Sequence, residues 1–281
     1  MHAYITVETL GATAALNATS TANISRMRQI SEAVSEQIDA FTKRTFQPRV
    51  QTVEMSARGG RTLLLRHDLI ALTSLKQDGN SDGTFDTTWA ATDYFTMPAD
   101  AEPTADYGRP FRRLEVSLRT NGAQDSFEVG QRNFQLAGTW GYSSILRTVT
   151  ANGSVDIDGT QTTLPLDATA GTTIQSGNTI KVGSEYIYVT VAGATATALT
   201  VLRGQRGTTA GSHGSGAAIQ VFDYPAPIRE AAFVQSSRHW KRKDSGFASD
   251  IGMVESGQLV TFKGGLDPDV RDLIRGYKRK G

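Results

Sequence analysis

The stretch 24–46, ISRMRQISEAVSEQIDAFTKRTF, most limits how this chain can fold. Its apolar residues recur at steps of three and four, which places them on one face of an α-helix. These residues are Met27, Ile30, Val34, Ile38 and Phe41. Thr21 or Asn23 suits the start of the helix as a cap, and Pro48 suits its end. A stripe this narrow needs a partner helix, and the next strong candidate begins near residue 228.

That second helix is expected at 228–243, IREAAFVQSSRHWKRK, directly after two prolines that suit a helix start. Its apolar and small residues wrap much of the circumference, which is typical of a helix with neighbours on more than one side. We assign Ile228, Phe233 and Trp240 to helix packing, together with the stripe of the first helix. One neighbour is then the first helix, and another is a second subunit.

The chain between these helices has the pattern of β-strands. Residues 49–57 alternate apolar and polar, and further short apolar runs separated by turn residues continue to about residue 146. The next stretch, 148–222, has seven charged residues in 75 and is rich in Thr, Gly and Ala. Its short β-like runs predict a compact all-β module inserted into the surrounding domain.

The sequence therefore predicts an α+β fold with three parts. These are a helical core from the N- and C-terminal ends, an antiparallel β-hairpin region, and an inserted all-β module. The expected domains are a core made of 1–147 and 223–281, and an inserted Thr/Gly-rich β domain at 148–222. A last short helix is expected at 270–278 after a Gly-rich link, with Asp267 as its cap and Pro268 in its first turn.

Composition excludes several classes of protein. The chain has no cysteine, so disulfides and thiolate metal sites are absent. No apolar run approaches the roughly 18 residues of a membrane-spanning helix, and residues 1–10 lack the pattern of a signal peptide. We expect a protein that stays in the cytoplasm where it is made. Its net charge of +1 argues against general nucleic-acid binding, so any DNA contact must be local.

No pattern in the sequence indicates catalysis, a metal or a cofactor. The four histidines, His2, His67, His213 and His239, are scattered and form no spaced metal set. The cluster 78–83 matches the first half of an EF-hand loop, but Trp89 stands where the bidentate Glu is required, which favours a polar hairpin turn. The Gly-rich stretch 204–216 lacks the GK[ST] of a phosphate-binding loop and is interpreted as a mobile loop.

Two short stretches concentrate basic residues, 238–243 and 271–280. Each is either a solvated helix end or a contact with nucleic acid or an acidic protein surface, and the sequence leaves both readings open.

Three pieces taken together resemble the head-tail connector (adaptor) proteins of tailed bacteriophages, which bind beneath the portal ring. The first is ISEAVSEQIDAFTKRTFQP (30–48), which ends in an R-T-F-x-P signature. The second is WAATDYF (89–95) with TWGY (139–142) after it. The third is PAPIREAAFVQSSRHWKRKDS (225–245) followed by LDPDVRDLIRGYKR (266–279). The resemblance covers about 1–146 and 223–281, whereas 148–222 resembles the Thr/Gly-rich β modules of phage structural proteins.

This resemblance implies a virion structural protein at the head–tail interface, assembled in the host cytoplasm. Such adaptors form a homo-oligomeric ring, commonly a dodecamer, beneath the portal. They extend the DNA channel and offer a docking surface to tail or stopper proteins, and they contact genomic DNA but no membrane. They have no enzymatic activity and no cofactor.

The C-terminal segment of these proteins reaches into the portal, which on this chain corresponds to 266–281. The portal-docking residues implied are Leu266, Asp267, Val270, Arg271, Leu273, Ile274, Arg275, Tyr277, Lys278 and Arg279. The residues expected as possible DNA-channel contacts are Arg238, Lys241, Arg242 and Lys243. The inserted module is expected to project outward toward the capsid, a tail component or a decoration protein.

The alternative is a tail or baseplate structural protein in which 148–222 binds a glycan or a protein. Fibre-like repeats would favour it, and none is visible in the sequence. A hydrolytic enzyme would need a triad or metal set that the sequence does not offer.

Overall fold

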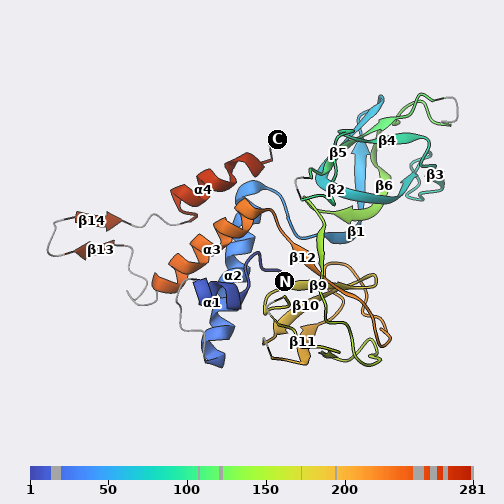
Figure 1. Cartoon of the computed structure of the whole chain (residues 1–281). Helices are drawn as coiled ribbons and strands as arrows, with labels where there is room; N and C mark the ends of the chain where they lie inside the picture. Colours follow the sequence, from blue (N-terminus) through green and yellow to red (C-terminus); the bar gives the residue numbers. More distant parts are fainter. Residues whose placement is uncertain are drawn as a thin grey trace. The chain divides into compact units, whose positions relative to one another are not determined.

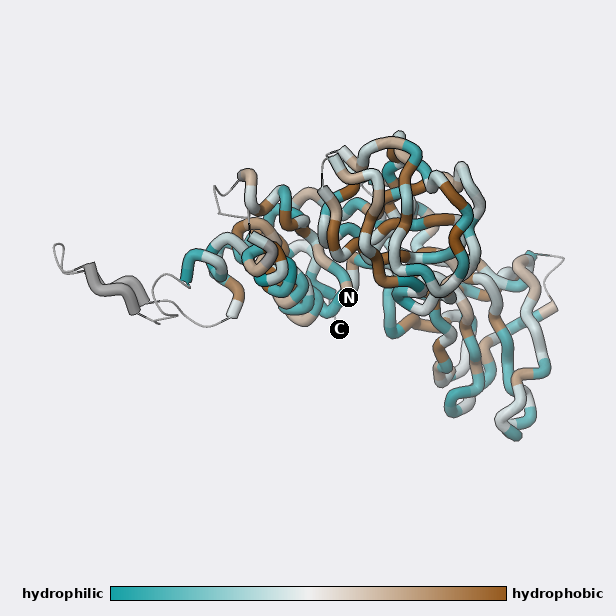
Figure 2. Tube along the Cα trace, turned by 90° about the horizontal axis from the view of Figure 1, so that it is seen from below, coloured by the Kyte–Doolittle hydropathy of each residue, from teal (hydrophilic) through white to brown (hydrophobic). Residues whose placement is uncertain are grey.

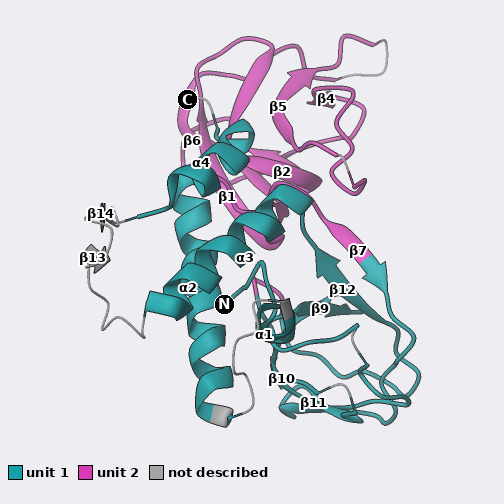
Figure 3. Cartoon of the chain, turned by 60° about the vertical axis from the view of Figure 1, so that its left-hand side comes forward, with its two compact units in different colours: residues 1–43, 147–205, 209–281 teal, residues 44–146, 206–208 magenta. Residues whose placement is uncertain are grey.

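A computed structural model describes most of the chain. The described residues are 1–13, 20–106, 108–119, 123–171, 173–193, 195–242, 250–253, 258–261 and 265–279. The chain divides into two compact units (Figure 3). Unit 1 comprises Met1–Lys43, Arg147–Gln205 and Thr209–Gly281, and unit 2 comprises Arg44–Leu146 and Arg206–Thr208.

Unit 2 is an antiparallel six-stranded sheet. Its strands are β1 (Arg49–Ala57), β2 (Thr62–Gln77), β3 (Thr87–Trp89), β4 (Tyr94–Met97), β5 (Phe111–Val116) and β6 (Gly130–Trp140). Their order is β1-β6-β2-β5-β4, with β3 paired to β2 (Figure 1). The long strand β2 changes partner along its length, because its first half pairs with β5 and its second half with β6. Aromatic rings fill the core, where Trp89 stacks on Phe127 and meets the edge of Phe134.

The β1–β2 turn shows why the sequence forms a hairpin here. Gly59 and Gly60 both take positive φ angles, of 86° and 91°. Glycine alone adopts this conformation without a steric penalty, so the pair reverses the chain between two strands. The strand predicted at 49–57 is confirmed with the same bounds.

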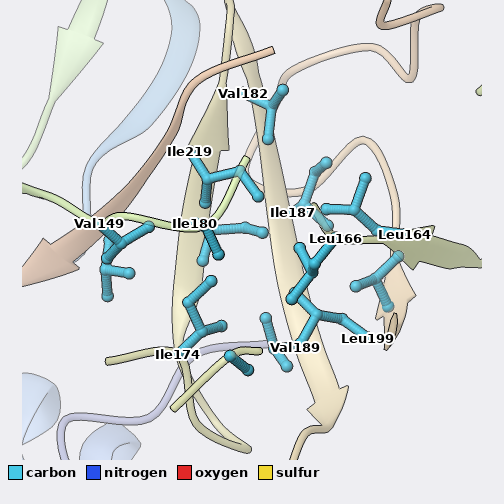
Figure 4. Close-up of a cluster of buried hydrophobic side chains, with 14 of the residues drawn as sticks. Val149, Leu164, Leu166, Ile174, Ile180, Val182, Ile187, Val189, Leu199 and Ile219 are labelled. Atoms are coloured by element: carbon cyan, nitrogen blue, oxygen red, sulfur yellow. The ribbon is translucent and has the colours of Figure 1, made fainter. Parts of the chain in front are cut away.

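Unit 1 holds the second antiparallel six-stranded sheet. Its strands are β7 (Ile145–Thr148), β8 (Thr163–Pro165), β9 (Thr179–Val182), β10 (Glu185–Val191), β11 (Ala198–Leu202) and β12 (Ile219–Asp223). The order is β7-β12-β9-β10-β11-β8, and β7 begins in unit 2 and ends in unit 1. One face of this sheet carries a cluster of buried aliphatic side chains that includes Ile180, Ile187 and Val189 (Figure 4). Hydrophobic residues recur along the strands between hydrophilic ones (Figure 2).

Four α-helices occur in the described part of the chain, and all belong to unit 1. They are α1 (Val7–Thr13), α2 (Thr21–Thr42), α3 (Ala226–Lys241) and α4 (Pro268–Ile274), and a 3-10 helix, η2 (Arg275–Tyr277), follows α4. A two-stranded hairpin, β13 (Asp250–Met253) with β14 (Gln258–Thr261), lies between α3 and α4 in the sequence. None of these helices combines the length and the apolar character that a membrane span requires, within the residues described.

Helix α2 is shorter than predicted and is capped by a different residue. The side chain of Ser20, not Thr21 or Asn23, caps its start by accepting the Asn23 N–H at 3.2 Å. The helix ends at Thr42, and the next residue, Lys43, is its C-cap and adopts a left-handed conformation with φ of 54°. The chain therefore leaves the helix before Pro48, and the R-T-F-x-P stretch lies outside it.

Strand β10, in the middle of the unit 1 sheet, is buried on both faces, and this explains why helices and strands form one compact unit. Along β10, Ile187 and Val189 belong to the aliphatic cluster, while Tyr188 on the opposite face is also fully buried. The Tyr188 hydroxyl donates a hydrogen bond to Glu32 of α2 at 2.7 Å. Arg28, one turn earlier on α2, donates to the Thr190 carbonyl at 2.9 Å. Helix α2 thus lies against the face of β10 opposite to the aliphatic cluster.

The expected fold class is wrong. The structure is mostly β, with two antiparallel six-stranded sheets, and it is not a helical core that carries an inserted β module. Helices α2 and α3 do pack together as expected, but they form only part of unit 1. The apolar stripe of α2 was read as the centre of a helical core, whereas the helices also close one face of a sheet. The division into a core and an inserted domain at 148–222 stays a prediction.

The Gly-rich stretch 204–216 is held to the sheet by a buried charge network. Glu185, with a side chain 2% exposed, accepts hydrogen bonds from Arg203, from the Gly204 and Gly211 amides, and from His213 at 2.7 Å. Burial alone would raise the pKa of Glu185, but these hydrogen bonds outweigh it and lower the pKa to about 2. The interpretation of this stretch as a mobile loop missed these contacts.

We predict that Glu185 makes unit 1 sensitive to acid. Because the pKa is lowered in the folded state, its contribution is complete above about pH 4.5 and is lost as pH falls toward 2. A shift of this size corresponds to about 3 kcal/mol of unfolding free energy. This loss of unfolding free energy is measured by urea unfolding, followed by circular dichroism, between about pH 2 and pH 7. Glu185→Gln should be less stable at neutral pH and should show a shallower pH dependence. An unchanged pH dependence would contradict the assignment.

Candidate functional site

The predicted portal-docking segment has a buried inner side. Leu266, Val270 and Ile274 are 7%, 1% and 0% exposed. They belong to unit 1, where α4 packs against α3. These three residues therefore stabilise the fold of unit 1 and are not available to a partner while α4 is seated.

The outer side of the same segment is exposed. Arg271, Leu273 and Arg275 face solvent, and Leu273 keeps 40% of its surface exposed. Tyr277 is half-buried. Asp272 is exposed beside them, so this side of the segment carries two cations, one carboxylate and one apolar side chain, a mixture that suits contact with a polar, partly apolar protein surface. We call Arg271, Leu273 and Arg275 the outer face of α4.

The end of the segment returns to α2. The Lys278 ammonium lies 5.3 Å from the centre of the Phe41 ring, a cation–π distance. The Arg279 amide donates to the carbonyl of Thr42, the last residue of α2, at 2.8 Å. The start of the segment is therefore fixed on α3 and its end on α2.

Arg238 of α3 holds the start of α4 through two carboxylates. Its guanidinium lies 2.6 Å from Asp267 and 2.7 Å from Asp269. These hydrogen bonds raise the pKa of Arg238. The hydrogen bond from Arg238 also lowers the pKa of Asp269. Asp267 was expected to cap α4 through its side chain, but it makes no such bond and pairs with Arg238 instead.

Gln235 is a residue that sequence reasoning missed. Its buried amide donates to the Gly265 carbonyl at 3.2 Å and to the His239 ring at 3.0 Å, and it accepts the Asp267 amide at 3.2 Å. It thereby satisfies the backbone where the chain enters α4. Burial and the nearby charge of Arg242 lower the pKa of His239. A lone Gln among small residues on α3 gave no signal of this role in the sequence.

The residues expected at the DNA channel have different surroundings. Arg238 is engaged by two carboxylates, Lys241 is exposed and Arg242 is half-buried. Lys243 lies outside the described residues. Of the four, only Lys241 presents a fully exposed charge within the described part of the chain.

Most of the residues assigned to helix packing are buried in unit 1. Met27, Ile30, Val34 and Ile38 on α2, and Ile228 and Trp240 on α3, are at most 8% exposed. Phe41 is half-buried beneath Lys278. Phe233 is half-buried and lines a pocket of about 510 Å³ beside Tyr4 and Phe222, with Arg147 and Arg229 at its wall.

Two of the marker motifs meet in unit 2. Arg44 of the R-T-F-x-P stretch forms an ion pair with Asp68 at 2.7 Å, and their side chains are only 7% and 3% exposed. The Arg44 guanidinium lies 5.2 Å from the centre of the Tyr142 ring, and Phe46 lies 5.2 Å from the same ring. The Tyr142 amide donates to the Thr45 carbonyl at 2.8 Å. We call these five residues the Arg44 junction.

The histidines have structural surroundings. His2 lies 3.2 Å from Asp39, and His213 belongs to the Glu185 network. His67 meets the edge of Trp140. No group of three or more His, Asp or Glu suited to a metal ion occurs among the residues that the structure describes.

The EF-hand-like cluster is a turn, as expected. The Asp78 carboxylate accepts the backbone amides of Ser81, Asp82 and Gly83 at 2.7 to 3.3 Å. A carboxylate used in this way organises the loop through its own backbone.

No family model matches the sequence, and no curated protein matches it either. The site is therefore described by its own geometry: a C-terminal segment seated on two helices, and a buried junction that joins two distant motifs.

We predict that Arg44→Ala destabilises unit 2 by about 3–5 kcal/mol, because it leaves the Asp68 carboxylate buried without its partner cation. Urea unfolding monitored by the fluorescence of Trp89 and Trp140 measures the loss. The control is the double variant Arg44→Met with Asp68→Leu, which removes both charges and should recover much of the stability. A double variant as unstable as the single one would contradict the ion-pair explanation.

Proposed function

We propose that this protein is a virion structural protein, a head-to-tail adaptor that forms a ring beneath the portal of a tailed phage. The ring extends the DNA channel and gives tail or stopper proteins a docking surface. It acts by oligomeric packing and electrostatics, without turnover, at the head–tail interface after assembly in the host cytoplasm.

The observation that carries this proposal is the Arg44 junction. The R-T-F-x-P and TWGY motifs lie almost 100 residues apart in the sequence, yet Arg44 and the buried Phe46 both contact the ring of the half-buried Tyr142. Motifs that pack together are markers of one structural element, which supports the ordered resemblance as a property of the fold. A chance match of short motifs gives no reason for such a contact.

The exposed outer face of α4 supports a docking role for the C-terminal segment. Arg271, Leu273 and Arg275 remain exposed, while the acidic residues Asp267 and Asp269 are engaged with Arg238. Two of its carboxylates are thus held by Arg238, whereas the third, Asp272, is exposed beside the two cations. We assign portal contact to this outer face, and we assign the buried Leu266, Val270 and Ile274 to seating the segment.

The seating of α4 changes how the docking role must be tested. Deletion of 266–281 would remove three buried side chains and expose the surfaces of α3 and α2 that they cover. Loss of binding after that deletion could follow from misfolding. Substitutions confined to the outer face avoid this problem.

We predict that Arg271→Glu with Arg275→Glu weakens portal binding several-fold without changing the unfolding midpoint. Reversing exposed interface charges slows association and adds repulsion, while the core side of α4 is untouched. Co-sedimentation with purified portal rings measures binding, and the mass of the complex gives the number of copies.

The matched control is Arg58→Glu with Arg61→Glu, two exposed arginines of unit 2 with the same change in charge. It should bind like the unchanged protein. Normal binding by the α4 variant would contradict the docking assignment. Absence of binding by the unchanged protein would contradict the adaptor function and favour a tail or baseplate role.

A further inference from the structure

The strand β4 is an open edge of the unit 2 sheet. It forms one end of the strand order, and within the described residues its only strand neighbour is β5. An edge strand leaves alternate backbone N–H and C=O groups unpaired, and these groups can bind another strand. The edge is short, at four residues.

A pocket of about 600 Å³ runs along this edge. Tyr94, Phe95, Thr96 and Met97 of β4 line it, and Arg119 stands at its wall. The Arg119 guanidinium lies 4.8 Å from the centre of the Phe95 ring, which is 36% exposed. An unpaired strand edge beside apolar pockets is the arrangement by which sheets bind an added strand, because the backbone gives affinity and the pockets accept alternate side chains.

The other edges are less suited to accept a strand. On β1, the Val50 amide already donates to the Arg206 carbonyl at 2.9 Å. Strand β8 ends in Pro165, which has no N–H to donate. Strand β3 is three residues long. Strand β7 is also an edge and contributes Arg147 to the pocket of about 510 Å³, whereas all four residues of β4 line the pocket along its edge.

The β13–β14 hairpin lacks a third strand among the described residues. In the described part of the chain its two strands pair only with each other. An isolated two-stranded hairpin is marginally stable in water and gains stability from a third strand or a packed face. Each of its strands has four residues, the length of β4. The stretch 250–261 contains Asp250 and Glu255 and no basic residue, so its charge is opposite to that of Arg119.

We infer that the β13–β14 hairpin of one copy adds to the β4 edge of a second copy and so joins neighbouring subunits. The partner is therefore another molecule of this chain, and the contact is a continued antiparallel or parallel sheet. This contact would join the subunits of the proposed ring. The number of copies joined rests on the proposed function. It assigns a function to the hairpin, which has no other strand partner among the described residues.

The absence of cysteine in the chain allows a clean test by cross-linking. Thr96→Cys labels β4, and Asp250→Cys or Gln258→Cys labels one strand of the hairpin. Full-length chains with one cysteine each are mixed pairwise and treated with a short bis-maleimide. Tags of different length identify the mixed dimer on a gel. Val191→Cys, an exposed position on β10, replaces the hairpin cysteine as the matched control.

We expect at least one hairpin position to give several-fold more mixed dimer with Thr96→Cys than Val191→Cys gives. Arg119→Glu in the Thr96→Cys chain should lower that yield several-fold by repelling the acidic hairpin. A yield equal to the control, both free in solution and on portal rings, overturns the inference. A doubly substituted chain that links only within itself also overturns it, because the hairpin would then bind its own β4.

Portal co-sedimentation of the same chains separates the two proposals. If the chain binds the portal but cross-links only at the control level, the hairpin contact is wrong and the adaptor function stands. If the chain cross-links through the hairpin but does not bind the portal, the contact stands and the adaptor function is wrong.

Discussion

Helix α2 has an apolar stripe that must be buried, and unit 1 is organised by that constraint. The short helix α1, just before it in the sequence, packs against it. Helix α3, from the far end of the chain, packs against it. Strand β10 meets its other side through the hydrogen bond from Tyr188 to Glu32. The C-terminal segment returns to its last turn through Lys278 and Arg279. These contacts together bury the helix, so helices and sheet are held as one unit.

Buried ion pairs stand where irregular chain meets regular structure. In unit 1, Glu185 and Arg203 hold the Gly-rich stretch against β10. In unit 2, Arg44 and Asp68 fix the chain that enters β1. A buried charge without its partner raises the free energy of the folded state. Such pairs therefore stabilise the one backbone path that brings both partners together. These ion pairs hold in place segments that have few apolar side chains of their own.

The same division of roles explains how the C-terminal segment can be both structural and functional. Leu266, Val270 and Ile274 seat α4, which leaves Arg271 and Leu273 presented on a fixed surface. A surface held in place binds a partner with a smaller loss of conformational entropy than a free tail would. The proposed docking face is therefore pre-organised by Leu266, Val270 and Ile274, which the sequence resemblance assigns to docking itself. The proposed contact between copies is a separate one, at the edge of β4 and the β13–β14 hairpin.

Sequence alone determined the local elements of this protein. The 3.6-residue stripe from Met27 to Ile38 located α2, and alternation with one early irregularity at 49–57 located β1 with its observed bounds. The turn character of the cluster at Asp78 was also predictable, because its polar residues bond to nearby backbone. These features depend on side-chain periodicity and on contacts a few residues away, which the sequence states directly.

Only the tertiary structure decided how these elements combine. Periodicity shows that Tyr188 lies in a strand but not that its second face would be covered by a helix some 150 residues away. It also cannot show that the side chain of Asp267, at the N-cap of α4, would pair with Arg238 and make no capping bond, or that Gln235 would bond the entry of α4. The balance between helix and sheet was misjudged for the same reason. Long-range burial and ion pairing depend on which surfaces meet in space, and that is fixed only when the whole chain is folded.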